Sequence, residues 1–86
     1  MAIVVSHIAA DFETLCRRAL RQAPLADVVE LRLDRVGHPG KEALAGFMAA
    51  CPKPVIVACH GAEAYGEFQG TAEEVFDLYH DAAEAG

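Results

Sequence analysis

Three ionisable residues spaced two apart, Glu30, Arg32 and Asp34, have the strongest potential for chemistry in this chain. Valine or leucine occupies each intervening position, at 29, 31 and 33. This period-two pattern predicts a strand with one apolar face and one charged face. An arginine in that setting suits a hydroxylated or carboxylate-bearing ligand. The alternative interpretation is the solvated face of an ordinary strand.

The flanking segments favour a functional role for this charged row. The run lies between segments with helix, strand and helix patterns, as the middle strand of a parallel sheet does. Such strands are usually buried on both faces and apolar throughout. Ionisable groups on one would have to be paired, or to line a cavity.

Two other predicted strands also end in polar residues. Ser6 and His7 end the first apolar run, and Cys59 and His60 end the third. In parallel α/β folds, chemistry gathers at the carboxyl ends of the strands. His60 is either a ligand contact, a proton carrier or a hydrogen-bonded structural residue. No Cys-x-x-Cys type of spacing supports a metal site, and no activating partner is evident for Cys59 as a nucleophile.

Hydrophobic periodicity divides the chain into three strand–helix units. Strands are predicted near residues 2–7, 28–34 and 54–60, and helices near residues 11–22, 41–51 and 71–85. Asp11 is placed to cap the first helix, and Thr71 with Glu74 forms a capping box for the third. We therefore expect one α/β domain over residues 1–86: three consecutive βα units with a parallel sheet, part of a (β/α)8 TIM barrel.

Three helices on one side of such a sheet would leave its other face and both edges uncovered. We expect the open face to combine the charged row with Ile3, Val5, Val55 or Val57. An apolar surface of this kind favours association. The sequence therefore predicts a homo-oligomer, joined edge to edge or face to face.

Composition limits the partners and the compartment. The 13 acidic and 7 basic residues give a net charge of -6, which disfavours nucleic acid and anionic membranes as partners. No apolar run is long enough for a membrane span, and the N-terminus lacks the features of a signal peptide. Three cysteines in apolar surroundings indicate free thiols. We expect a soluble cytoplasmic protein without a cofactor or metal.

The charged strand resembles the Glu-x-Arg-x-Asp strand of type I 3-dehydroquinate dehydratase. One βα unit later, residues 54–60 and the Gly66–Gly70 segment are similar to that family's Pro-(Val/Leu)-Ile strand and Gly-Gly-x-Phe-x-Gly loop. The resemblance implies a barrel enzyme of the shikimate pathway that dehydrates 3-dehydroquinate through a lysine Schiff base, with a histidine moving protons. It also implies that Glu30 and Arg32 bind substrate, that Asp34 matches a further acidic residue, and that Ser6 corresponds loosely.

The chain departs from the family pattern at several positions. His60 stands where the family has a substrate-binding arginine, Ala64 where it has a glutamate, and Tyr65 replaces the first glycine of the pair. The family's catalytic histidine and lysine belong to later strands. The only lysines here are Lys41, after the second predicted strand in the loop or helix that follows, and Lys53, just before the third, and neither lies at the catalytic end of a strand. At 86 residues the chain has three of eight units of a roughly 250-residue barrel.

Three hypotheses follow for the function. The first is the N-terminal part of a dehydroquinate dehydratase-like barrel, inactive alone because no catalytic residue lies in this chain. The second is a non-catalytic βα module for assembly or small-molecule binding. The third is a different small α/β enzyme that uses Glu30, Arg32 and His60. In each case the expected ligand is a small hydroxylated carboxylate such as 3-dehydroquinate, with Ser6 and Asp34 as further candidate contacts.

Overall fold

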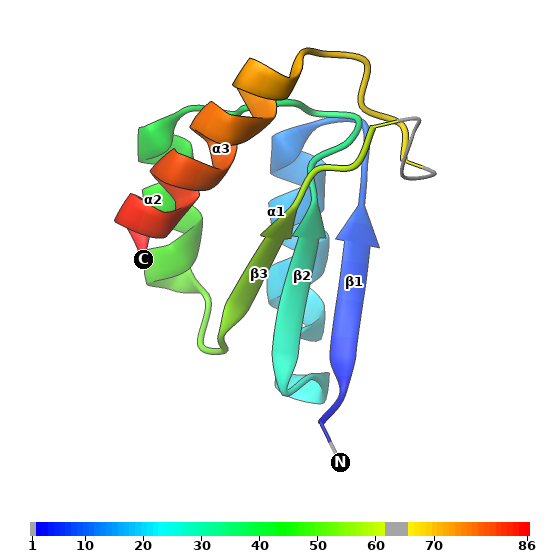
Figure 1. The fold of residues 1–86 in the computed structure, drawn as a ribbon. Helices are drawn as coiled ribbons and strands as arrows, with labels where there is room; N and C mark the ends of the chain where they lie inside the picture. The colour runs from blue at the N-terminus through cyan, green and yellow to red at the C-terminus, as the bar shows by residue number, and fades with distance from the viewer. Residues whose placement is uncertain (1, 62–65) are drawn as a thin grey trace.

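The computed structural model describes residues 2–61 and 66–86, and shows three strands alternating with three helices (Figure 1). One turn of 3-10 helix, Ala23–Leu25, links the first helix to the second strand. The elements are β1 (Val4–Ile8), α1 (Phe12–Gln22), β2 (Val28–Arg32), α2 (Lys41–Ala50), β3 (Val55–Ala58) and α3 (Ala72–Ala85). None of these described helices is long and apolar enough to cross a lipid bilayer.

The strands form one parallel sheet in the order β1-β2-β3. The helices lie to one side of the sheet, so that the other face is open toward the viewer in Figure 1. The carboxyl ends of all three strands lie together at the top of that view. The prediction of three consecutive βα units with a parallel sheet, as in a partial TIM barrel, is therefore confirmed.

Burial between the sheet and the helices fixes the orientation of each strand. On β2, Val29 and Leu31 are completely buried, as is Leu33 just after the strand. The core consists of these residues and apolar side chains from the helices and adjoining segments: Ala9, Leu15, Ala19, Ala23, Ala26, Leu44, Phe47, Cys59, Leu78 and Ala82. Because successive side chains alternate between faces, Glu30 and Arg32 project from the opposite, uncovered face.

On β1 and β3, the side chains that face the open side lie one position along the strand from those predicted. Val5 and Val55 lie in register with the buried Val29, and Val57 with Leu31, so all three valines face the helices and pack against the core. The exposed apolar residues of these strands are instead Val4 and Ile56. A one-residue shift exchanges the two faces of a strand. The expectation for Val5, Val55 and Val57 was therefore wrong.

The helix starts follow from local side-chain bonds, as predicted. The Asp11 carboxylate accepts a hydrogen bond from the Thr14 backbone N–H at 2.8 Å and caps α1. Thr71 and Glu74 form the reciprocal capping box of α3. These bonds supply acceptors for amide groups that the first turn of a helix leaves without partners.

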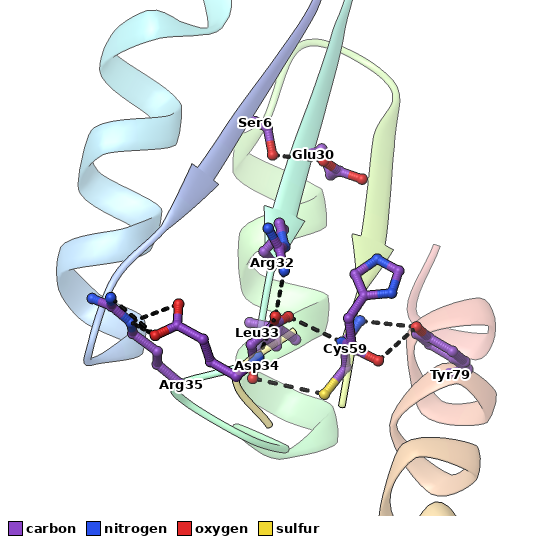
Figure 2. Close-up of polar contacts among 10 residues, drawn as sticks. Ser6, Glu30, Arg32, Leu33, Asp34, Arg35, Cys59 and Tyr79 are labelled. Carbon is purple, nitrogen blue, oxygen red and sulfur yellow. Dashed lines mark hydrogen bonds and ion pairs between the residues drawn. The ribbon is translucent and has the colours of Figure 1, made fainter. Parts of the chain in front are cut away.

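The outer edge of β3 is partly covered by a side chain from α3. The Tyr79 hydroxyl accepts a hydrogen bond from the Cys59 backbone N–H at 2.8 Å and donates to the Cys59 carbonyl at 3.3 Å (Figure 2). In a parallel sheet, alternate residues of a strand direct both backbone groups to the same neighbour. Pro54 and Ala58 bond to β2, so Cys59 points away from it. Tyr79 therefore occupies the place of a neighbouring strand at this residue.

We expect the substitution Tyr79→Phe to destabilise the fold by about 1–2 kcal/mol, because it leaves two backbone groups of Cys59 without their partner. The amide hydrogen of Cys59 should exchange faster with solvent while those of β2 stay protected. Urea unfolding and hydrogen exchange measure the two effects. Asp77→Asn, at an exposed position of the same helix, should change stability by under about 0.5 kcal/mol. Equal effects of the two substitutions would contradict a role for the hydroxyl.

Candidate ligand-binding site at the strand ends

The uncovered face of the sheet carries a polar pair across β1 and β2. Ser6 and Glu30 are in register, and the Ser6 hydroxyl donates a hydrogen bond to the Glu30 carboxylate at 2.6 Å (Figure 2). Ile56 of β3 continues this row and is exposed. The pair therefore lies on an open surface, with a carboxylate and a hydroxyl available to hydroxyl groups of a ligand.

Arg32 lies one step further toward the carboxyl end on the same face. Its Nη2 donates to the Asp34 carboxylate at 2.5 Å, and its side chain is 31 % exposed. Among the described residues its Nε has no hydrogen-bond partner, although the atom is buried. Two members of the charged row, Arg32 and Asp34, are thus paired with each other, whereas Glu30 accepts a hydrogen bond from the Ser6 hydroxyl. Arg32 keeps donor groups that its protein partner does not use.

Asp34 lies beyond the end of β2, and its side chain is 0 % exposed. Besides Arg32, the carboxylate accepts hydrogen bonds from the backbone N–H groups of His60 at 3.0 Å and Glu67 at 3.1 Å. Burial alone would raise the pKa of Asp34. The hydrogen bonds from His60, Glu67 and Arg32 outweigh that effect and hold the pKa below its usual value. A direct contact with ligand, as predicted for Asp34, would have to compete with these bonds.

His60 follows β3 and is partly buried. Its backbone carbonyl accepts a hydrogen bond from Phe68 N–H at 3.0 Å. Gly66 approaches it closely: a Cβ at Gly66 would lie 2.0 Å from the His60 carbonyl oxygen, so this position requires glycine. The segment after β3 is therefore fixed through the backbone of His60, while the imidazole is a separate candidate for ligand contact. Ala64 and Tyr65, named above as departures from the family pattern, lie outside the described residues.

Three clefts lie in the described part of the chain. One of about 800 Å³ lies between the segment after β2 and residues 66–70. Another of about 620 Å³ lies between α2, α3 and β3, and a third of about 240 Å³ lies beside His60 and the start of α3. None of these three is lined by Ser6, Glu30 or Arg32. Ser6, Glu30 and Arg32 therefore lie on the open surface of the sheet. The other two predicted ligand contacts do line clefts: Asp34 lines the one of about 800 Å³, and His60 the one of about 240 Å³.

Sequence reasoning assigned no role to Glu67 or Arg35, two residues of the strand-end region. Glu67 donates its backbone N–H to Asp34, and its carboxylate pairs with Arg35 at 3.2 Å. The only sequence signal for Glu67 was its place within the Gly66–Gly70 motif.

Cys59, considered above as a nucleophile, has a buried thiol. Burial, assisted by the negative charges of Asp34 and Glu74, raises the pKa of this thiol to about 11. The thiol is therefore uncharged and unreactive near neutral pH.

The parallel βα units define a partial α/β barrel, with polar residues at the strand ends as the candidate site. A model of the Type I 3-dehydroquinase family matches residues 3–86. The chain belongs to this family. A search of curated proteins finds no match.

A second histidine on the sheet faces the helices. His7 of β1 is 8 % exposed, and its Nε2 has no hydrogen-bond partner among the described residues. Burial lowers the pKa of His7, and the positive charge of Arg18 lowers it further. The folded protein therefore keeps this imidazole neutral at a pH at which the unfolded chain binds a proton.

This difference predicts a loss of stability in mild acid. As the pH falls through the ordinary histidine pKa of 6.5, the unfolded state gains a proton that the folded state resists. The loss is at most about 1.4 kcal/mol per pH unit for this one group. Urea unfolding at about pH 7.5 and about pH 5.5 measures it. His7→Asn should reduce the loss, whereas the exposed-site control His80→Asn should not. An unchanged pH dependence in His7→Asn would contradict this account.

Proposed function

We propose that this chain supplies the part of a 3-dehydroquinate site that binds the substrate carboxylate and hydroxyl groups. The proposal rests on the position of Arg32, whose guanidinium lies on the uncovered face of the sheet, near the carboxyl end of β2 (Figure 2). Membership of the Type I 3-dehydroquinase family supports the choice of ligand. The guanidinium is planar and binds carboxylates through paired hydrogen bonds.

The neighbouring side chains have complementary roles in this proposal. Glu30 and Ser6 face the same open side, where the Glu30 carboxylate accepts a hydrogen bond from a ligand hydroxyl and Ser6 orients that carboxylate. His60 contacts the ligand from the end of β3. Its imidazole stands where the family resemblance places an arginine, so the chain has one cation fewer for an anionic ligand at neutral pH.

Imine formation is not part of the function we propose for this chain. An imine-forming lysine needs an uncharged amine beside the substrate carbonyl. Lys41, at the start of α2, binds Glu84 at 2.5 Å, and this hydrogen bond raises the pKa of its ammonium group, with further help from the Glu84 charge. Lys53 precedes β3 and donates to the Ala26 carbonyl, at the amino ends of the strands. Neither lysine is on the same side and end of the sheet as Arg32.

The reaction context follows from the family. We propose that the chain acts in the cytoplasmic shikimate pathway, toward aromatic amino acids, and that dehydration of 3-dehydroquinate needs a histidine and a lysine that this chain does not supply. No cofactor is required by Schiff-base chemistry. A non-catalytic module that binds the same hydroxylated carboxylate is the second candidate, favoured by the ion pair that occupies Lys41.

We also propose that the chain works as a homo-oligomer. The support is the exposed apolar surface of the sheet, where Val4 and Ile56 are 51 % and 44 % exposed beside the polar row. Covering these side chains removes apolar surface from water. Assembly through this face would also enclose Arg32 and Glu30, where water competes less for a ligand.

The binding proposal is tested by titrating the chain with 3-dehydroquinate in a calorimeter. We expect Arg32→Ala to weaken binding at least about 10-fold, since a charge-assisted hydrogen bond contributes about 1.5–3 kcal/mol. Arg17→Ala, on the exposed side of α1, is the matched control and should bind as the parent does. Borohydride added to the mixture should trap no adduct. Equal affinities in both variants, or an adduct at Lys41 or Lys53, would contradict the proposal.

Sedimentation velocity at micromolar concentration tests the assembly. We expect species larger than the 9.2 kDa monomer, and a melting temperature that rises with protein concentration because association stabilises the folded state. Ile56→Lys should shift the distribution toward the monomer, whereas Leu25→Lys, at a 76 % exposed position of the 3-10 turn before β2, should not. A folded monomer with a melt independent of concentration would refute the oligomer.

A further inference from the structure

Three donors from three separate segments meet at the buried Asp34 carboxylate. Oδ2 accepts from Arg32 Nη2 on β2 at 2.5 Å and from Glu67 N–H at 3.1 Å. Oδ1 accepts from His60 N–H, just after β3, at 3.0 Å. Because the side chain is 0 % exposed, the carboxylate is engaged within the chain and is not presented at the surface. Its two oxygens join the Arg32 guanidinium to the backbone that carries His60.

We propose that Asp34 is a positioning residue for ligand binding: it fixes the direction of the Arg32 guanidinium and its distance from the end of β3. The inference rests on the proposed function, in which Arg32 binds the ligand carboxylate. Asp34 acts through Arg32 and through the His60 backbone, and makes no contact with the ligand itself. It thus has a different role from Glu30, whose carboxylate lies on the open face.

Asp34 has two opposite effects on ligand affinity: its negative charge weakens the binding of a carboxylate, and its positioning of the Arg32 guanidinium strengthens it. A substitution of Asp34 can therefore show which effect is larger. The negative charge of Asp34 partly cancels that of Arg32, and this effect alone would weaken the attraction for a carboxylate. A fixed guanidinium, in contrast, loses less side-chain freedom when the ligand binds. Removal of the Asp34 charge should therefore strengthen binding if electrostatics dominates, and weaken it if positioning dominates. We expect positioning to dominate because the same carboxylate also holds His60 and Glu67.

Asp34→Asn tests this role with little change in shape. A carboxamide has one acceptor oxygen, whereas the native carboxylate oxygens receive three donors. With its oxygen toward His60, its amide nitrogen would face the donors of Arg32 and Glu67. The guanidinium would then lose its tether. Asp27→Asn is the matched control, because Asp27 also accepts a backbone N–H, from Ile3 at 2.7 Å, but lies just before β2, at the other end of that strand.

The experiment is a double-mutant cycle with 3-dehydroquinate as the probe, read by calorimetry. We expect Asp34→Asn to weaken binding about 10-fold when Arg32 is present and less than about 2-fold in the Arg32→Ala background, as for residues that act as one unit. Asp27→Asn should leave the affinity unchanged. Equal or tighter binding by Asp34→Asn, or the same fold-loss in both backgrounds, would overturn the proposal. If Asp34→Asn does not fold, Asp34→Glu replaces it and should weaken binding at least about 5-fold; unchanged affinity overturns the inference.

A second readout separates this inference from the proposed function. If the parent chain does not bind 3-dehydroquinate, the proposed function is refuted and the double-mutant cycle gives no signal. Side-chain NMR of the Arg32 Nε–H and amide exchange at His60 and Glu67 then decide the positioning role. Asp34→Asn, or Asp34→Glu if the first variant does not fold, should mobilise the guanidinium and speed both amide exchange rates at least about 10-fold. Unchanged guanidinium and amide signals would overturn the inference.

Discussion

The double-sided pairing of β2 is the constraint on which the rest of the structure depends. This strand bonds to β1 on one edge and to β3 on the other, while Val29 and Leu31 are completely buried against the helices. With both edges and one face occupied, the remaining face is the only direction left for Glu30 and Arg32. The polar row is thus a consequence of the core: the same alternation that buries the aliphatic residues presents the charged ones.

The sequence predicted those features that depend on local patterns. The alternation of β2, the capping residues Asp11 and Thr71, and the strand–helix repeat each depend on a few adjacent residues, and all appear in the structure. The facing of β1 and β3 was predicted wrongly because an uninterrupted run of β-branched residues has no alternation to distinguish its two sides. Only the register with β2 determines which valines lie inward.

Three hydrogen bonds near the strand ends could not be predicted, because they join positions far apart in the chain. Asp34 has the same spacing from Arg32 as Arg32 has from Glu30, yet it is buried by backbone groups 26 and 33 residues away. The helical pattern indicates that Tyr79 is one more inward residue of an amphipathic helix. In the structure its hydroxyl bonds to the backbone of Cys59, 20 residues earlier. Periodicity predicts the face on which a side chain lies, but not the backbone groups that the chain brings to it.

The Tyr79 hydroxyl also makes the two outer edges of the sheet unequal as places for strand addition. A strand that paired with β3 and with Cys59, the residue that follows it, would have to displace the two hydrogen bonds that Cys59 makes with the Tyr79 hydroxyl of α3. No such exchange with Tyr79 is needed along β1. Growth of the sheet by edge pairing is therefore directional: addition beside β1 is opposed less than addition beside β3, and a new strand that extends to Cys59 is thermodynamically linked to release of the Tyr79 hydroxyl.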